Sequence, residues 1–164
     1  MTPLTKYFLA VLIATICALF MGPLGGPSVL TTEEVVARCA ESKQCRLLTE
    51  VSYYESRNQS DKGVVAVMSV VMNRASHPTK WPNTISGVLS QKHQFTYKWD
   101  GNLKKDFIEK EQYTRIALLA HSVLNGGIDS VVGNATFYHR KDISPSWSKH
   151  KVKVAQIESH NFYR

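Results

Sequence analysis

Cysteine and the common catalytic motifs are scarce in this sequence. Only 3 of its 164 residues are cysteine, which excludes a small scaffold held together by many disulfides. The chain contains no HExxH or CxxC pattern, no GxSxG nucleophile elbow and no GxxxxGK[ST] phosphate loop. Their absence removes the usual signatures of zinc sites, α/β-hydrolases and P-loop enzymes. The length also excludes a TIM barrel.

Acidic side chains are few as well, and this gives the chain a basic character. Lys and Arg number 20 against 13 Asp and Glu, so the formal net charge is +7. Such an excess predicts an acidic partner, which could be nucleic acid, an anionic membrane or a bacterial wall polymer. No RRM, helix-turn-helix or zinc-finger pattern is present, so we do not expect nucleic acid as the partner.

The histidines do not form a recognisable metal-binding pattern. A zinc site could be assembled from His139, His150 and His160 only if the fold brought these distant positions together. Solvated or hydrogen-bonded histidines are the favoured interpretation. We therefore expect neither a metal nor a soluble cofactor.

The most apolar part of the chain is its N-terminal segment. Residues 7–30 carry no charged side chain, and Lys6 precedes them directly. A basic residue before an apolar run is typical of an export signal, so we predict that residues 1–30 are a signal peptide or an uncleaved signal-anchor helix. The densest part, residues 8–21, is short for a membrane span, which needs about 20 apolar residues. Either outcome places residues 31–164 outside the cytoplasm, in the periplasm or cell wall, with a tether to the inner membrane if the segment stays.

The rest of the chain has the pattern of one mostly helical domain. Apolar spacing predicts helical segments between residues 33 and 55, a short helix at 85–89 and a clear helix at 106–125 that Gly126 and Gly127 end. Residues 64–73 are nearly all apolar, which favours a buried helix, although their valine content also fits a strand. Residues 135–139 alternate like a short strand. We expect an α+β, predominantly α, fold.

Because carboxylates are scarce, Glu55 is conspicuous. It lies at the end of a predicted helix, directly after Tyr53 and Tyr54 and shortly before the apolar run at 64–73. Aromatic neighbours that exclude water would raise the pKa of this carboxyl, which is how a glutamate becomes a general acid near neutral pH. A surface glutamate at a helix end is the plain alternative.

Several short motifs follow one another along the chain: ESRNQ at 55–59, GVVAV at 63–67, NR at 73–74, PNTI at 82–85, QFT at 94–96, ATFY at 135–138, Pro145-x-Trp147 and His160-x-Phe162. In this order they resemble the SleB-type cell wall hydrolases of spore cortex and phage. Each motif is loose, but their common order is specific. Two positions in the first motif depart from the family pattern: Asn58 replaces a glycine and Gln59 replaces a second glutamate. Ser159 replaces the glycine before the closing histidine.

The resemblance implies a compact lysozyme-like helical domain with a small β element. It also implies cleavage of the β-1,4 bond between N-acetylmuramic acid and N-acetylglucosamine, as in lytic transglycosylases and endolysins. Glu55 would be the catalytic acid and then the base, which needs no second carboxylate and is consistent with Gln59. Sugar hydroxyls and amides would be bound by Ser56, Gln94, Thr96 and Tyr138. We expect a monomer that acts on peptidoglycan strands.

Two other functions remain open at this point. A lysozyme-type muramidase would use water and a second carboxylate, for which Asp61 or Asp100 are the candidates. A non-catalytic, exported wall-binding protein would explain the departures at Asn58 and Gln59 without requiring any activity.

The three cysteines also lead to a prediction. Outside the cytoplasm, Cys39 and Cys45 could form a disulfide. Cys17 would stay unpaired in the apolar segment, or it could attack that disulfide by thiol exchange after leaving the membrane. A plain Cys39–Cys45 disulfide is the simpler expectation.

Overall fold

The structure, a computed structural model, describes residues 29–77, 79–92, 94–95 and 108–164. Residues Thr31–Arg164 form one compact unit. Its elements follow one another as α2 (Thr32–Glu41), α3 (Lys43–Ser56), α4 (Asp61–Ala75), α5 (Ile85–Ser90), α6 (Lys110–Leu124), β1 (Phe137–Arg140), the 3₁₀ helix η3 (Ser146–His150), β2 (Lys153–Ile157) and β3 (His160–Tyr163). This confirms a helix-rich fold with a small sheet. The predicted N-terminal helix lies outside the described residues.

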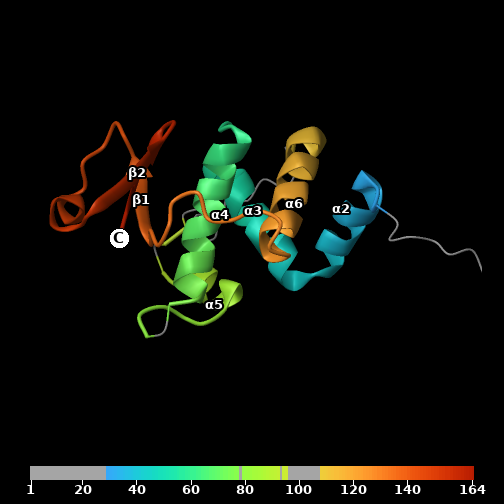
Figure 1. The fold of residues 1–164 in the computed structure, drawn as a ribbon, viewed down its shortest axis with the longest axis horizontal. Helices are drawn as coiled ribbons and strands as arrows, with labels where there is room; N and C mark the ends of the chain where they lie inside the picture. The colour runs from blue at the N-terminus through green and yellow to red at the C-terminus, as the bar shows by residue number, and fades with distance from the viewer. Residues whose placement is uncertain (1–28, 78, 93, 96–107) are drawn as a thin grey trace, which may run out of the picture. The chain divides into compact units, whose positions relative to one another are not determined.

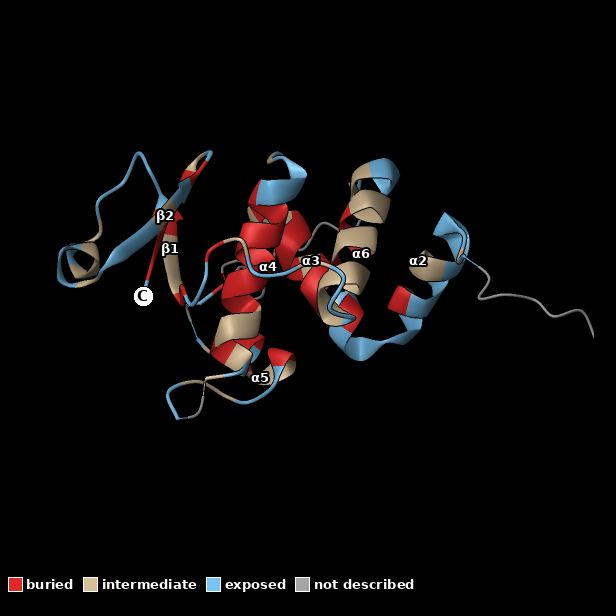
Figure 2. Ribbon diagram, viewed as in Figure 1, coloured by how far each residue is buried: buried red, intermediate tan, exposed pale blue. Residues whose placement is uncertain are grey.

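Helix α4 is the centre of the molecule. Figure 1 shows it between the sheet on one side and α3 and α6 on the other. Every residue from Gly63 to Val71 is buried, so α4 is buried around its whole circumference, as Figure 2 shows in red. Val64, Met68 and Val71 belong to a core shared with the other helices, whereas Ala66 and Val70 belong to a second core under the sheet. The helical interpretation of residues 64–73 is therefore correct, and the strand alternative is wrong.

The helix ends are formed by local signals. Thr31 and Glu34 make a reciprocal capping box at the start of α2, and Ser60 accepts a hydrogen bond from the Gly63 amide at the start of α4. Helix α6 ends at Leu124, and Gly126 then adopts a φ of 72°. Glycine takes this left-handed conformation without steric cost, which explains why the predicted stop is in the right place.

The sheet is antiparallel, with β3 in the middle in the order β1-β3-β2. Tyr138 on β1 pairs with Phe162 on β3, and the two-residue turn between β2 and β3 contains Glu158 at a φ of 49°. Sequence patterning predicted a strand near β1 only. Strands β2 and β3 are short and were not predicted. β2 is mostly exposed on an edge, so its burial pattern is weak.

Hydrogen bonds join the segment before β1 to one end of α4 and the β2–β3 turn to the other. At its C-terminal end, Asn73 Nδ2 donates to the carbonyls of Gly133 and Ala135 at 2.7 and 2.8 Å, and Arg74 Nε donates to the Thr136 carbonyl at 2.7 Å.

At the N-terminal end of α4, the contacts come from the β2–β3 turn. The Ser60 amide donates to the Glu158 carboxylate at 3.1 Å, and Ser159 Oγ donates to Gln59 Oε1 at 2.9 Å. A β-carbon at Gly63 would lie 2.6 Å from Gln59 Cβ, so this close approach requires glycine.

The helical side of the molecule carries a disulfide. Cys39 in α2 is bonded to Cys45 in α3, with a Cα–Cα distance of 5.0 Å, and both cysteines are buried in the core. Cys17 lies outside the described residues. Among the residues that the structure describes, no helix is long and apolar enough to cross a membrane.

Candidate active site

Glu55 and Tyr138 meet between the helices and the sheet. Glu55 lies one residue before the end of α3 and is half-buried, and Tyr138 projects from β1. The Tyr138 hydroxyl donates to Glu55 Oε2 at 3.1 Å, although the two residues are 83 positions apart. The Tyr138 ring stacks on Phe162 and contacts His160 edge-on, which fixes the direction of its hydroxyl.

The surroundings of Glu55 favour a carboxyl that holds its proton. Burial raises the pKa of Glu55 above its usual 4.5, and this outweighs the hydroxyl of Tyr138 and the charge of Arg74, which both lower it. Burial and the nearby Glu55 charge hold the pKa of Tyr138 well above its usual value, so Tyr138 remains a hydrogen-bond donor. Glu55 is thus suited to give up a proton and to be stabilised as a carboxylate afterwards.

Arg74 is a buried cation beside this pair. Its residue is only 5% exposed, and its guanidinium carbon lies 4.5 Å from the centre of the Trp81 ring and 5.5 Å from that of Phe95. Burial lowers the pKa of Arg74, while Tyr138 and Glu55 raise it. Within the described part of the chain it makes no ion pair, and its Nη1 is buried without a hydrogen-bond partner.

Leaving a buried donor unpaired costs about 1–3 kcal/mol. The site therefore holds a buried cation near Glu55 that has no ion-pair partner among the described residues. In the sequence, Arg74 stands out only as part of the NR motif at 73–74. The signal for its role was a charged residue at the end of an otherwise apolar helix.

Two cavities meet at Glu55. The larger, which we call the main groove, has a volume of about 940 Å³ and is lined by Tyr54, Glu55, Arg74, Gln94, Phe137, Tyr138, His139, Arg140, Ile143, Pro145, Trp147 and His160. The smaller, which we call the side pocket, has a volume of about 400 Å³ and is lined by Tyr54, Glu55, Ser56, Arg57, Asn58, Gln59, Arg140, Ser159 and His160. Because Glu55 lines both, a chain-like ligand could extend to either side of its carboxyl.

The structure brings most of the predicted binding residues to these cavities. Gln94 and Tyr138 line the main groove, and Ser56 lines the side pocket. Ser56 is nevertheless buried, and its hydroxyl donates to the Ser52 carbonyl at 2.8 Å within α3. Thr96 lies outside the described residues.

The candidates for a second carboxylate are placed differently. Asp61 forms an ion pair with Arg115 and lines neither the main groove nor the side pocket. Asp100 lies outside the described residues. Gln59, which stands where the family pattern has a glutamate, uses its side-chain carbonyl to accept from Ser159. Two of the three departures from the family pattern, Gln59 and Ser159, are therefore bonded to each other.

Metal ligation has no visible basis in the described ranges. They contain no group of three or more His, Cys, Asp or Glu side chains that could hold a metal ion. Both ring nitrogens of His139 are engaged, Nδ1 with the Arg140 carbonyl at 2.7 Å and Nε2 with the Tyr163 hydroxyl at 2.8 Å.

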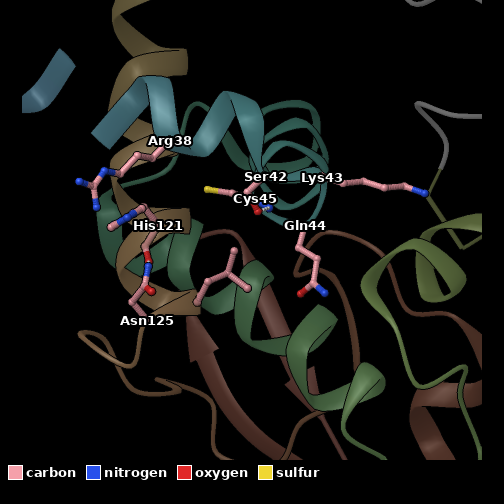
Figure 3. A pocket seen from close by; sticks show the side chains of 8 residues that line it. Arg38, Ser42, Lys43, Gln44, Cys45, His121 and Asn125 are labelled. Atoms are coloured by element: carbon pink, nitrogen blue, oxygen red, sulfur yellow. Dashed lines mark hydrogen bonds between the residues drawn. The ribbon is translucent and has the colours of Figure 1, made fainter. Parts of the chain in front are cut away.

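A further cavity of about 420 Å³ lies on the helical side, next to the disulfide. Figure 3 shows Arg38 and His121 on one side of it, while Lys43 extends the other way. Its lining contains no carboxylate, so it offers no acid for proton transfer.

Known proteins are similar to this chain in sequence and in structure. A family model described as cell wall hydrolase matches residues 58–163, a range that begins just after Glu55. A spore cortex-lytic enzyme from Halalkalibacterium halodurans is 33% identical over 120 residues, which are 71% of this chain and 33% of that enzyme. A second such enzyme, from Oceanobacillus iheyensis, is 32% identical, with 40% of its length covered. The chain thus spans well under half the length of these curated relatives.

Two solved structures are similar over most of their length. One is the catalytic domain of the germination-specific lytic transglycosylase SleB from Bacillus anthracis, with 29% identity, a TM-score of 0.61, and coverage of 75% of this chain and 96% of that one. The other is the catalytic domain of the Bacillus cereus SleB protein, with 26% identity, a TM-score of 0.58, and coverage of 88% and 99%.

Proposed function

The chain belongs to the cell wall hydrolase family, and on this premise we propose that residues 31–164 are a catalytic domain that cleaves peptidoglycan strands. The bond is the β-1,4 linkage between N-acetylmuramic acid and N-acetylglucosamine, and the reaction is that of a lytic transglycosylase. The observation that best supports the proposal is the environment of Glu55. Its carboxyl has a raised pKa, accepts from Tyr138 and lies where two cavities meet.

In the first step, protonated Glu55 gives its proton to the glycosidic oxygen as the bond to the muramyl anomeric carbon breaks. The leaving sugar departs with a free hydroxyl, and the muramyl ring becomes oxocarbenium-like. Tyr138 and Arg74 stabilise the carboxylate that Glu55 has become, because both favour its charged form.

In the second step, the Glu55 carboxylate accepts the proton of the muramyl 6-hydroxyl while that oxygen bonds to the anomeric carbon. The product is a 1,6-anhydro sugar, no water is consumed, and Glu55 is protonated again. Gln94 lines the groove from a polar segment and can bind a sugar hydroxyl or acetamido group. We extend the same role to Thr96.

Hydrolysis by water is the second candidate, since it would need the same acid. It is the weaker one because Asp61 is held by Arg115 away from the groove. The two reactions give products that differ by one water, so mass analysis of the muropeptides separates them.

The segment before residue 31 serves export in this proposal, as a signal peptide or a signal anchor. The Cys39–Cys45 disulfide supports an oxidising compartment such as the periplasm or cell wall. Release from the membrane would suit an endolysin and would allow Cys17 to exchange with that disulfide. We propose a monomer.

The test is digestion of purified peptidoglycan by the parent chain and by Glu55→Gln, with Glu41→Gln as a matched control on an exposed position of α2. General acid catalysis contributes about 10²–10⁴-fold. We expect a loss of that order for Glu55→Gln, none for the control, and anhydro products from the parent. Parental activity in Glu55→Gln would disprove the assignment, and hydrolysed products would establish the muramidase reaction instead.

A further inference from the structure

A basic cavity lies against the main groove, with Phe137 forming part of the wall of both. It has a volume of about 310 Å³, and its lining includes His77, Lys80, Lys151 and Arg164 but no Asp or Glu side chain. We call this cavity the basic pocket. Arg164 is the last residue, and Figure 1 shows the end of the chain beside β1.

Two lysines from distant parts of the chain converge on the shared wall. Lys151 Nζ lies 3.8 Å and Lys80 Nζ lies 4.7 Å from the centre of the Phe137 ring. The aromatic ring attracts each cation, but the two ammonium groups repel each other. Neither lysine forms an ion pair with any residue that the structure describes.

Arg140 differs from these two lysines in having an ion-pair partner. Arg140 lines the groove and the side pocket, but its guanidinium is paired with Asp142 at 2.7 Å. Its charge is therefore neutralised locally, whereas Lys80 and Lys151 have no ion-pair partner among the described residues. Two convergent cations of this kind can form a site for an anion, and a bound anion would relieve their repulsion.

We propose that the basic pocket binds the carboxylates of the stem peptide carried by the muramyl residue in the main groove. The inference rests on the proposed function, because a glycan strand at Glu55 would carry its peptides on the lactyl groups of alternate sugars. The substrate of this chain is then a peptide-bearing strand, and Lys80 and Lys151 determine the preference for it.

The test compares three substrates that are free of phosphate-containing wall polymers. These are peptide-bearing strands, the same strands with their carboxyl groups amidated, and strands from which the peptides have been removed. The variant is Lys80→Gln/Lys151→Gln. The matched control is Lys62→Gln/Lys110→Gln, which removes the same charge from two exposed lysines that do not line the pocket.

We expect the parent chain to have its lowest KM on peptide-bearing strands. The Lys80→Gln/Lys151→Gln variant should raise that KM about five- to tenfold, which corresponds to about 1–1.4 kcal/mol for the two ion pairs together. Its KM on amidated and peptide-free strands should match that of the parent, and the control should match the parent on all three.

Three results would overturn the inference. They are an equal KM on all three substrates for the parent, an equal KM increase on all three for the variant, and a variant defect that arises only after phosphate-containing wall polymers are added back. The last would assign the pocket to phosphate. Failure of the proposed function looks different, because the parent chain would then cleave none of the strands.

Discussion

Replacing Tyr138 with phenylalanine tests how the site stabilises the charged form of Glu55. The substitution removes the hydroxyl that donates to Glu55 Oε2 at 3.1 Å but keeps the ring that stacks on Phe162. A hydrogen bond to a neutral acceptor contributes a net of about 0.5–1.5 kcal/mol, and one to a charged acceptor about 1.5–3 kcal/mol. The bond therefore strengthens by roughly 1–1.5 kcal/mol when Glu55 loses its proton.

This difference sets the size of the expected effect. In the proposed reaction, Glu55 becomes a carboxylate as the glycosidic bond breaks, so only the strengthening of the bond accelerates the step. Since about 1.4 kcal/mol corresponds to tenfold in rate, Tyr138→Phe should lower kcat roughly tenfold. The free energy of unfolding should fall by only about 1 kcal/mol, the value of a neutral hydrogen bond.

The pH dependence of the activity provides a second measurement of the bond between Tyr138 and Glu55. Glu55 acts in its protonated form, so activity should fall as pH rises through its pKa. The Tyr138 hydroxyl lowers that pKa, and its removal should therefore move the alkaline limb to higher pH. The assay is release of soluble muropeptides from a peptidoglycan suspension over a range of pH.

Tyr163→Phe is the matched control for this experiment. It removes a hydroxyl from the neighbouring strand β3 that bonds to His139 at 2.8 Å and does not touch Glu55. We expect a similar change in stability with no movement of the alkaline limb. The proposed role of Tyr138 is refuted if Tyr138→Phe keeps the parental kcat and pH profile, or if both variants shift the alkaline limb alike.

Two further predictions concern stability. Because burial raises the folded-state pKa of Glu55 above its usual 4.5, its contribution to stability is fully present below that value and is lost as pH rises through the folded-state pKa. Glu55→Gln should therefore melt at a higher temperature than the parent near pH 7 and at the same temperature near pH 4, and a constant difference across thermal scans would contradict this. Replacing Cys39 and Cys45, which are separated by 6 positions, with serine should lower the free energy of unfolding by about 2 kcal/mol in denaturant titrations. Reduction of the parent should cause a similar drop, and an unchanged midpoint in both cases would show that the disulfide is energetically neutral.

Local chemistry explains what the sequence could predict about this fold. The start of α4 at Ser60 and the stop of α6 before Gly126 follow from side chains that act on their own helix. Position 55 was singled out by the series of motifs that resembles the SleB-type family, because one glutamate after two tyrosines is by itself a weak signal. The type of element at residues 64–73 was ambiguous, because a valine-rich apolar run fits either a buried helix or a strand. In the structure this segment is a helix that contributes to two separate cores.

The parts that were not predictable depend on the path of the whole chain. Arg74 is held by a backbone carbonyl, that of Thr136, and any residue can supply such a group. The bond between Gln59 and Ser159 joins two positions 100 residues apart. In the sequence alone, Gln59 is only a lost glutamate, since nothing nearby indicates that Ser159 is its partner.

Because hydrogen bonds attach the β part of the fold at both ends of α4, the length of this helix sets the distance between the two attachments. Its 15 residues span about 22 Å at roughly 1.5 Å per residue, and this length fixes the spacing between the Gln59 and Arg74 attachment points. One inserted residue would turn everything beyond it by about 100° and release one attachment. Tyr138 would then no longer reach Glu55. The length of this helix should therefore be the same in any domain that keeps these two attachments.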